Sequence, residues 1–533
     1  MEVASAEDPS SRGGRGFPLL PVLTGLAAVV AGLPLVGIVV AALSGPGADI
    51  AARDVWRYAL TSAWLTLLVG AITAVVGSIA AWLVVMYRFP GRRFFSWALA
   101  LPLAAPAFAL AYAYADLFDV AGPLRMWMRA GLGFDLPFEM RSLEGAAFVL
   151  SCAFYPYVFL AMRAAFLNQA VSALEAAHVL GSSKADAFRR IALPLARPAL
   201  AAGVALAIME TLADYGALQF LSVQTLTTGV VRAWSVYGST AGAVQFALPL
   251  LGAAALLLWV ERKGRAGRRF DSAATRWRSL PETRLRGVRA AGAFLFCLIL
   301  LTAGLLLPVG WLAWTSLRIS PEWSRLVQAV ANTLGLGLAG AVVTVMLATA
   351  LALGARRLPL AVRLASLGYA TPGAAMAIGL LIPASVVWSW FPDAASTFWA
   401  GLILLVYAYA ARLMAAALEP VDAGLSRVTP AMIWASRSLG RSEASTAWAV
   451  QLPIARGALF TAGLVVFIDV LKELPATLIL RPFNFDTLAV IASNYALDER
   501  LGQAGWPSLL ILAISIPAVV WLSGKVAGSR PGH

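Results

Sequence analysis

Long apolar runs alternate with short polar segments along almost the whole chain, and this alternation predicts membrane-spanning helices. A helix needs about 20 predominantly apolar residues to cross the hydrocarbon core of a bilayer. The sequence therefore predicts an all-α membrane protein with about twelve transmembrane helices. The apolar runs that meet this length cover residues 18–43, 58–87, 95–117, 144–166, 199–222, 243–260, 290–315, 331–355, 362–388, 397–418, 457–480 and 507–524.

One polar segment occurs twice. Residues 175–200 (EAAHVLGSSKADAFRRIALPLARPAL) and 434–459 (WASRSLGRSEASTAWAVQLPIARGAL) are identical at 11 of 26 positions without a gap. The copies begin 259 residues apart, and each one leads into an apolar run. A repeat of this kind indicates two homologous units in one chain. Because six spans precede the second unit, we expect two six-helix halves in parallel orientation.

The repeat and the apolar runs divide the chain into predicted units. The junction between the halves holds ten of the 41 Lys and Arg residues against three acids. It could bind a partner, but a tether attracted to lipid phosphates explains the same charge more simply. The units are an N-terminal tail (1–17), a first half (18–260) with its loop at 172–198, the basic linker (261–289), a second half (290–524) with its loop at 431–457, and a C-terminal tail (525–533).

The positive charges predict the orientation, because Lys and Arg concentrate in cytoplasmic loops. With a cytoplasmic N-terminus, the basic turns after the second, fourth and eighth spans all lie inside, and so does the C-terminus. Loops on the other side carry mixed charges. The inside turns contain Arg88, Arg92, Arg93, Lys184, Arg189, Arg190, Arg197, Arg356, Arg357 and Arg363.

Composition supports the membrane assignment and excludes several classes. The chain is 60% apolar and 13% charged, whereas soluble domains carry about 25% charged residues. The net charge of +14 fits contact with membrane lipid rather than nucleic acid. Cys152 and Cys297 lie inside apolar runs, and the only histidines are His178 and His533. We therefore expect neither a disulfide framework nor a histidine-rich metal site.

The repeated loop has the pattern of two short helices joined by a turn. Glu175, Ala176 and Ala177 favour a helix, and Gly181 can adopt the positive φ that ends one. Leu193 and Pro194 then lead the chain back into the bilayer. An exposed helix held in this way suits a partner's groove. An ordinary cytoplasmic loop is the alternative, and the recurrence in register argues against it.

The same residues resemble a known family motif. Glu-Ala-Ala, three residues, Gly, nine residues, Ile, one residue and Leu-Pro resembles the EAA loop of importer-type ABC transporter permeases. The second copy replaces the Glu by Trp434, the second Ala by Ser436 and the Ile by Val450. It keeps four positions, Ala435, Gly440, Leu452 and Pro453. The resemblance implies that both loops dock on a dimer of separate ABC ATPase subunits.

The chain itself lacks the sequence expected of an ATPase. No segment matches GxxxxGK[ST], and Gly181-Ser-Ser-Lys184 is too short to enclose phosphates. We therefore expect no enzyme activity and no cofactor in this chain, with ATP used by the partner subunit.

Four carboxylates stand at repeated positions in the apolar runs that follow the two loops. Glu210 and Asp214 correspond to Asp469 and Glu473 at the same offset of 259. At a spacing of i, i+4 each pair would occupy one helix face near mid-membrane, where ionisable groups usually face a cavity or a partner. One interpretation is an acidic cation pathway. The other is a structural role, in pairs with Lys472 or at helix ends.

The amino-acid sequence around these acids resembles one branch of this family. Segments 469–489 (DVLKELPATLILRPFNFDTLA), 209–221 (METLADYGALQFL) and 155–169 (YPYVFLAMRAAFLNQ) look like those of fused ferric-iron permeases. The resemblance implies a ferric-iron permease in the bacterial inner membrane, supplied by a periplasmic or lipid-anchored substrate-binding protein. Thiamine, a polyamine or an organophosphonate is an alternative cargo. An ion-coupled secondary transporter is the alternative of a different class, although it would not need the twin loops.

Overall fold

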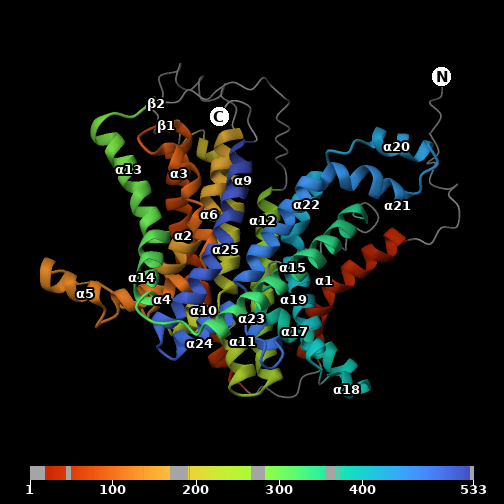
Figure 1. Ribbon diagram of the computed structural model, residues 1–533, viewed down its shortest axis with the longest axis horizontal. Helices are drawn as coiled ribbons and strands as arrows, with labels where there is room; N and C mark the ends of the chain where they lie inside the picture. Colours follow the sequence, from red (N-terminus) through yellow and green to blue (C-terminus); the bar gives the residue numbers. More distant parts are fainter. Residues whose placement is uncertain are drawn as a thin grey trace.

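The computed structural model describes residues 19–43, 50–135, 137–168, 190, 192–265, 283–354, 368, 371–395 and 397–528. Within these residues the protein is a bundle of long helices (Figure 1). Eleven helices are long and apolar enough to cross a membrane, or twelve if one bent pair counts as a single span. The predicted all-α membrane fold is confirmed.

Five spans of the first half lie at the predicted runs, although α9 begins and ends earlier than its run. They are α1 (Leu19–Leu43), α2 (Ala52–Met86), α6 (Leu143–Asn168), α9 (Leu193–Ala213) and α12 (Thr240–Arg265). Shorter elements lie between them: β1 (Tyr87–Arg88), α3 (Arg92–Ala98), the 3-10 turn η2 (Leu101–Ala104), α4 (Ala107–Phe118), α5 (Pro123–Trp127), the π-helical turn η3 (Met128–Leu132), α10 (Gly216–Phe220) and α11 (Leu226–Ser235).

The second half repeats this order. Its spans are α13 (Gly287–Leu301) continued by η5 (Thr302–Leu306) and α14 (Leu307–Ser316), then α15 (Trp323–Gly354), α17 (Gly373–Trp390), α19 (Phe398–Leu425), α22 (Leu452–Leu471) and α25 (Leu501–Gly528). Its shorter elements are α18 (Pro392–Ala395), α20 (Pro430–Ser438), α21 (Glu443–Thr446), η6 (Ala447–Gln451), α23 (Pro475–Leu480) and α24 (Leu488–Leu497). A two-residue strand, β2 (Thr283–Arg284), precedes α13 and pairs in parallel with β1.

The third predicted span, 95–117, is broken rather than straight. The chain bends by 92° between the segments Arg92–Ala104 and Ala107–Leu132. Pro106 explains the break, because a proline disfavours helical backbone at the residue before it. Ala105 accordingly has an extended conformation, with ψ near 131°. The predicted single span is therefore a bent pair of apolar segments.

The first span of each half packs on the other half. α1 lies against α15, α17 and α19 of the second half as well as α12 of its own half, and α14 lies against α4 of the first half as well as α25 of its own half. Thr24 of α1 donates a hydrogen bond to the carbonyl oxygen of Ala350 in α15, at 3.0 Å. At the α1–α17 contact, a Cβ on Gly37 would lie 2.1 Å from the carbonyl oxygen of Gly379. Glycine at both positions therefore allows the backbones to touch, as small residues do between membrane helices.

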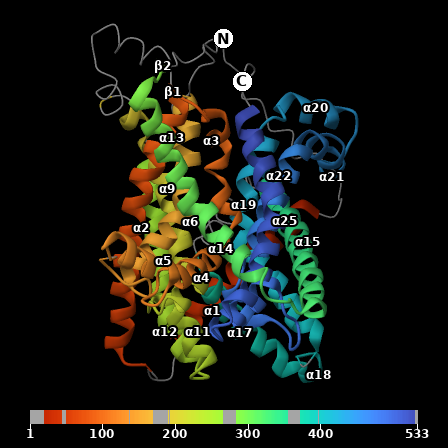
Figure 2. The same ribbon diagram turned by 60° about the vertical axis from the view of Figure 1, so that its left-hand side comes forward.

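The two ends of the bundle differ. β1, β2, α20, α21 and the last turns of α25 gather at one end, and α11, α18 and the first turns of α2 lie at the other (Figure 2). α20 and α21 project beyond the packed spans at their end of the bundle (Figure 1). The end that carries β1 and α20 is called the loop end below.

Candidate functional site

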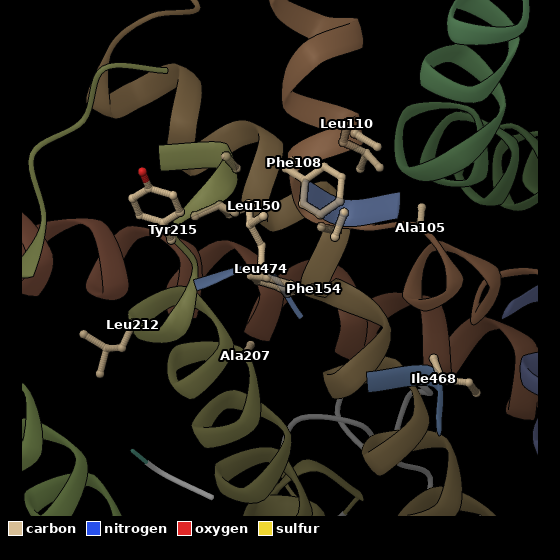
Figure 3. Close-up of a cluster of buried hydrophobic side chains, with 14 of the residues drawn as sticks. Ala105, Phe108, Leu110, Leu150, Phe154, Ala207, Leu212, Tyr215, Ile468 and Leu474 are labelled. Carbon is tan, nitrogen blue, oxygen red and sulfur yellow. The ribbon is translucent and has the colours of Figure 1, made fainter. Parts of the chain in front are cut away.

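The structure brings all four sequence-predicted carboxylates to one central cavity. Glu210, Asp214, Asp469 and Glu473 line it together. The cavity volume is about 70 Å³, which leaves room for a few water molecules. Apolar side chains from both halves also line it, among them Phe108, Phe154, Tyr215 and Leu474. Figure 3 shows these four side chains within the surrounding cluster of buried hydrophobic residues.

The expected arrangement of each acid pair on one helix face is wrong. The predicted spans 199–222 and 457–480 end early, at Ala213 in α9 and at Leu471 in α22. Asp214 is the first residue after α9 and has extended backbone. Glu473 likewise follows the end of α22. The second acid of each pair therefore lies in a break between a long helix and a short one.

These breaks are built in the same way in both halves. The backbone N–H groups of Ala217 and Leu218 in α10 donate to Oδ1 of Asp214, at 3.0 and 3.3 Å. The N–H of Ala476 in α23 donates to Oε1 of Glu473 at 3.2 Å. Each carboxylate thus satisfies amides in the first turn of a short helix, where the N–H groups lack intrahelical partners. The helix-end interpretation of these two acids is therefore correct as geometry.

The acids of the second half also form ion pairs. Lys472 Nζ lies 3.0 Å from Asp469 Oδ1, and the side chains are 20% and 18% exposed. Arg412 of α19 pairs with Glu473, with side chains only 12% and 7% exposed. Lys472 also interacts electrostatically with Glu210 of the first half. The cavity therefore contains four carboxylates and two cations, and the charges of the two halves meet there.

Arg412 was missed from the sequence because it stands in an apolar run. Residues 155–162 (YPYVFLAM) and 407–414 (YAYAARLM) match in pattern, and this match places Leu160 opposite Arg412. A polar residue at a position where the other half has leucine was the available signal. The first half has no arginine at this position, so the two breaks differ in charge although they agree in backbone.

Gly373 leaves the space that the Arg412–Glu473 pair occupies. A Cβ on Gly373 would lie 2.2 Å from Oε1 of Glu473 and 3.2 Å from Nη1 of Arg412. Gly373 is the first residue of α17 and follows Pro372, just as Ala107 follows Pro106 at the start of α4. The larger buried pair in the second half requires the smaller residue.

The second repeated loop is a helix, a turn and a continuing helix. α20 ends at Ser438, and Gly440 has φ of +82°, the left-handed conformation that favours glycine. Residues Glu443–Leu471 then form a single span through the π-helical turn η6. The second short helix of this loop therefore continues into the span without a break at Leu452-Pro453. A π-helical turn directly before Leu452-Pro453 accommodates the proline that would otherwise break the helix.

This loop presents apolar side chains to its surroundings. Trp434 and Leu439 are 72% and 82% exposed, and Ala435 lies between them on α20. The hydroxyl groups of Ser436 and Thr446 form a buried hydrogen bond of 3.1 Å that holds α20 against α21. The aromatic residue that departs from the first copy is therefore an exposed group on a fixed helix.

Only part of the first loop can be compared. Glu175, Ala176, Ala177 and Gly181 lie outside the described residues. Leu193 and Pro194 are the first two residues of α9, as Leu452 and Pro453 are of α22. The Leu-Pro step therefore begins the corresponding helix in both halves.

Metal ligation in the cavity would need a different arrangement. Across the described ranges, no three carboxylate, imidazole or thiol groups come together as a metal site requires. The carboxylates accept hydrogen bonds and form ion pairs instead. Among these residues, the arrangement is suited to a charged junction between the halves rather than to a resident ion.

Comparison with known proteins indicates which class of transport protein the chain resembles. The family described as binding-protein-dependent transport system inner membrane component matches residues 73–321. The Fe(3+)-transport system permease protein FbpB 2 of Haemophilus influenzae is 25% identical over 471 residues, which is 86% of this chain and 87% of the relative. Residues 73–321 therefore match the importer permease family, and the chain resembles a permease of the binding-protein-dependent type over most of its length.

Other relatives of this permease match only one part of it. The sulfate transport system permease protein CysT of Salmonella typhimurium is 32% identical over 148 residues, 28% of this chain and 52% of the relative. The sulfate transport system permease protein CysW of Escherichia coli is 29% identical over 167 residues, which is 31% of this chain and 56% of the relative. The chain thus spans about half the length of these sulfate relatives. As a permease, it is a multi-pass protein of the inner membrane.

Proposed function

We propose that this permease carries ferric iron across the inner membrane, taking it from a separate binding protein and using the energy of a separate ATPase dimer. The observation that carries the proposal is the similarity to an Fe(3+)-transport permease over 86% of the chain, which spans both halves. The sulfate relatives each match about a third of the chain. A cavity with four carboxylates and two cations also disfavours a divalent anion.

The loop end is the proposed cytoplasmic and ATPase-docking side. α20 projects there, and the side chains of Trp434 and of Leu439 at its C-terminal end are exposed. Exposed apolar side chains held on a helix are typical of protein interfaces. The basic turn Arg88–Arg93 lies at the same end, as Lys and Arg do in cytoplasmic loops. Both termini are then cytoplasmic, and the binding protein approaches the opposite end.

The central cavity is the proposed route, in a closed state. Ion-paired side chains line this cavity, so the route opens when the groups that meet there separate. The Lys472–Asp469 and Arg412–Glu473 pairs stabilise the closed arrangement, and the excess of carboxylates favours a cation when it opens.

Reconstituted vesicles test the cargo. Vesicles containing the permease, its ATPase and its binding protein should accumulate radioactive iron only when ATP and all three proteins are present. Sulfate offered to the same vesicles should stay outside. Uptake of sulfate, or iron uptake that does not need ATP, would refute the proposed function.

The acids are tested by comparing Asp214→Asn with Glu473→Gln. The Asp214→Asn side chain keeps an oxygen that can accept from Ala217 and Leu218, so abundance should hold while iron uptake falls several-fold. The Glu473→Gln change would leave Arg412 without its charged partner in a poorly exposed site, so abundance itself should fall. Normal iron uptake by an Asp214→Asn permease at normal abundance would remove Asp214 from the route.

A further inference from the structure

A groove opens between α2 and α13 at the loop end, away from the central cavity. Its volume is about 1140 Å³. Its deeper wall is apolar: Ile79, Trp82 and Leu83 come from α2, and Ala293 and Phe296 from α13. Because α2 and α13 are both membrane spans, this wall lies at the level of the hydrocarbon chains.

The rim of the groove is strongly basic. Arg284, Arg286 and Arg289 line it at the level where α13 begins, and all three are exposed. The described part of the chain supplies no carboxylate within ion-pair distance of any of them. Three guanidinium groups above an apolar cleft form an amphipathic site, with its positive end at the membrane surface.

The backbone fixes the spacing of these arginines. Tyr87 pairs with Thr283, and Arg88 with Arg284, in the short parallel ladder. Side chains alternate along the extended segment that follows. Leu285 is accordingly half-buried and packs on the core, while Arg284 and Arg286 are exposed. The end of the basic linker is therefore held by β1 rather than lying freely on the membrane.

The dimensions match those of a phospholipid. Arg289 and Phe296 are seven residues apart on α13, so the groove descends about 10 Å at 1.5 Å per residue. That depth takes a phosphate at the rim and the first part of an acyl chain below it. Gly292 lies midway, and a Cβ there would meet no atom within 4 Å, so the groove is open at this point.

We propose that this groove binds an anionic phospholipid, with the phosphate on Arg284, Arg286 and Arg289 and one acyl chain between α2 and α13. Basic pockets between spans at the cytoplasmic surface attract anionic head groups, and arginine makes paired hydrogen bonds to phosphate. The lipid would join the first half to the first span of the second, beside the β1–β2 pair and the ring contact of Phe95 with Phe294. The proposal does not depend on the cargo.

Thermal unfolding of the purified full-length permease in neutral detergent tests the site. Phosphatidylglycerol should raise the melting temperature by several degrees, and phosphatidylcholine should raise it much less. The triple variant Arg284→Gln, Arg286→Gln and Arg289→Gln should lose most of the response to phosphatidylglycerol. The matched triple lysine variant should keep a large part of it, because the positive charge remains.

A second variant separates the groove from the charge. Gly292→Leu places a side chain in the groove without a clash, so it should weaken the response while the lipid-free melting temperature changes little. Gly310→Leu is its control, because Gly310 is exposed in α14, also meets no atom within 4 Å and lies outside the groove. Equal stabilisation by the two lipids, or an undiminished response in the glutamine triple, would overturn the proposal.

Discussion

The indole nitrogen of Trp311 donates a hydrogen bond of 2.7 Å to the Asp116 carboxylate. Trp311 belongs to α14, the first span of the second half, and Asp116 belongs to α4 of the first half. This bond therefore links the first span of the second half to the first half. Both residues are half-buried, so water competes with the bond only in part.

Trp311→Phe should destabilise the permease by about 1.5 kcal/mol, because a hydrogen bond to a charged acceptor is lost while the ring's bulk largely remains. Asp116→Asn should cost less, since the amide oxygen can still accept. Trp314→Phe, on an exposed position of the same helix, is the control. Thermal unfolding in detergent measures all three, and an unchanged Trp311→Phe protein would contradict the stabilising role.

Gly373→Ala should lower stability by about 1–3 kcal/mol, the usual cost of forcing an extra methyl group into a packed site. The new Cβ would overlap Glu473 and crowd Arg412, so the buried pair must separate. Gly463→Ala is the matched control, because the nearest atom to its Cβ is 4.0 Å away. A helical glycine with such space should gain about 0.5–1 kcal/mol as alanine. Equal behaviour of the two variants would contradict the packing described here.

Glu473→Gln and Arg412→Leu should each destabilise by about 3–5 kcal/mol, because each leaves one buried charge uncompensated. The double variant should cost clearly less than the sum. Leucine is chosen because Leu160 holds the matching position in the first half. Asp469→Asn should have a smaller effect, since the Lys472–Asp469 pair is more exposed. Additive losses in the double variant would show that the pair contributes no coupling.

Trp434→Ala should reduce binding of the ATPase at least tenfold without changing the melting temperature of the permease. An exposed aromatic side chain contributes little to its own fold, but such residues often dominate an interface. Trp56→Ala is the control, because Trp56 is 65% exposed in the first turns of α2 at the opposite end. Co-purification with the ATPase gives the result, and full recovery of ATPase with Trp434→Ala would refute docking at α20.

Gly440→Asp should abolish the stimulation of ATP hydrolysis by substrate, and transport with it, while the protein still inserts. The added carboxylate would stand at the turn between α20 and α21, where Gly440 has φ of +82°. Substrate-stimulated hydrolysis by the complex is the measurement. Hydrolysis at the normal rate would mean that the turn does not contact the ATPase.

The sequence was most informative where one physical requirement dominates. A bilayer demands about 20 apolar residues for each helix, so the runs at 58–87 and 144–166 predicted α2 and α6 closely. The repeat placed Glu210, Asp214, Asp469 and Glu473 in equivalent positions, and the structure brings them together. Whether they conduct an ion remains a prediction.

The sequence was least informative where apolar composition continues through a change in geometry. Residues after Asp214 and Glu473 are as apolar as those before, so hydropathy could not mark the ends of α9 and α22. The break in the third span was indicated by Pro106 alone, and the second cation of the cavity by Arg412 alone. The packing of α1 and α14 on the other half could not be predicted, because both helices make these contacts through ordinary apolar and small residues.

The packing of α1 on the second half has a consequence for how the protein is made. α1 leaves the ribosome first, yet the helices it packs on, α15, α17 and α19, are synthesised roughly 300 residues or more later. Until then, the part of its surface that packs on the second half, including Gly37, can only face lipid or a chaperone. Carrying both halves on one polypeptide delivers the missing neighbours to the same insertion site in a fixed ratio. Biogenesis of the first half is therefore completed only by translation of the second.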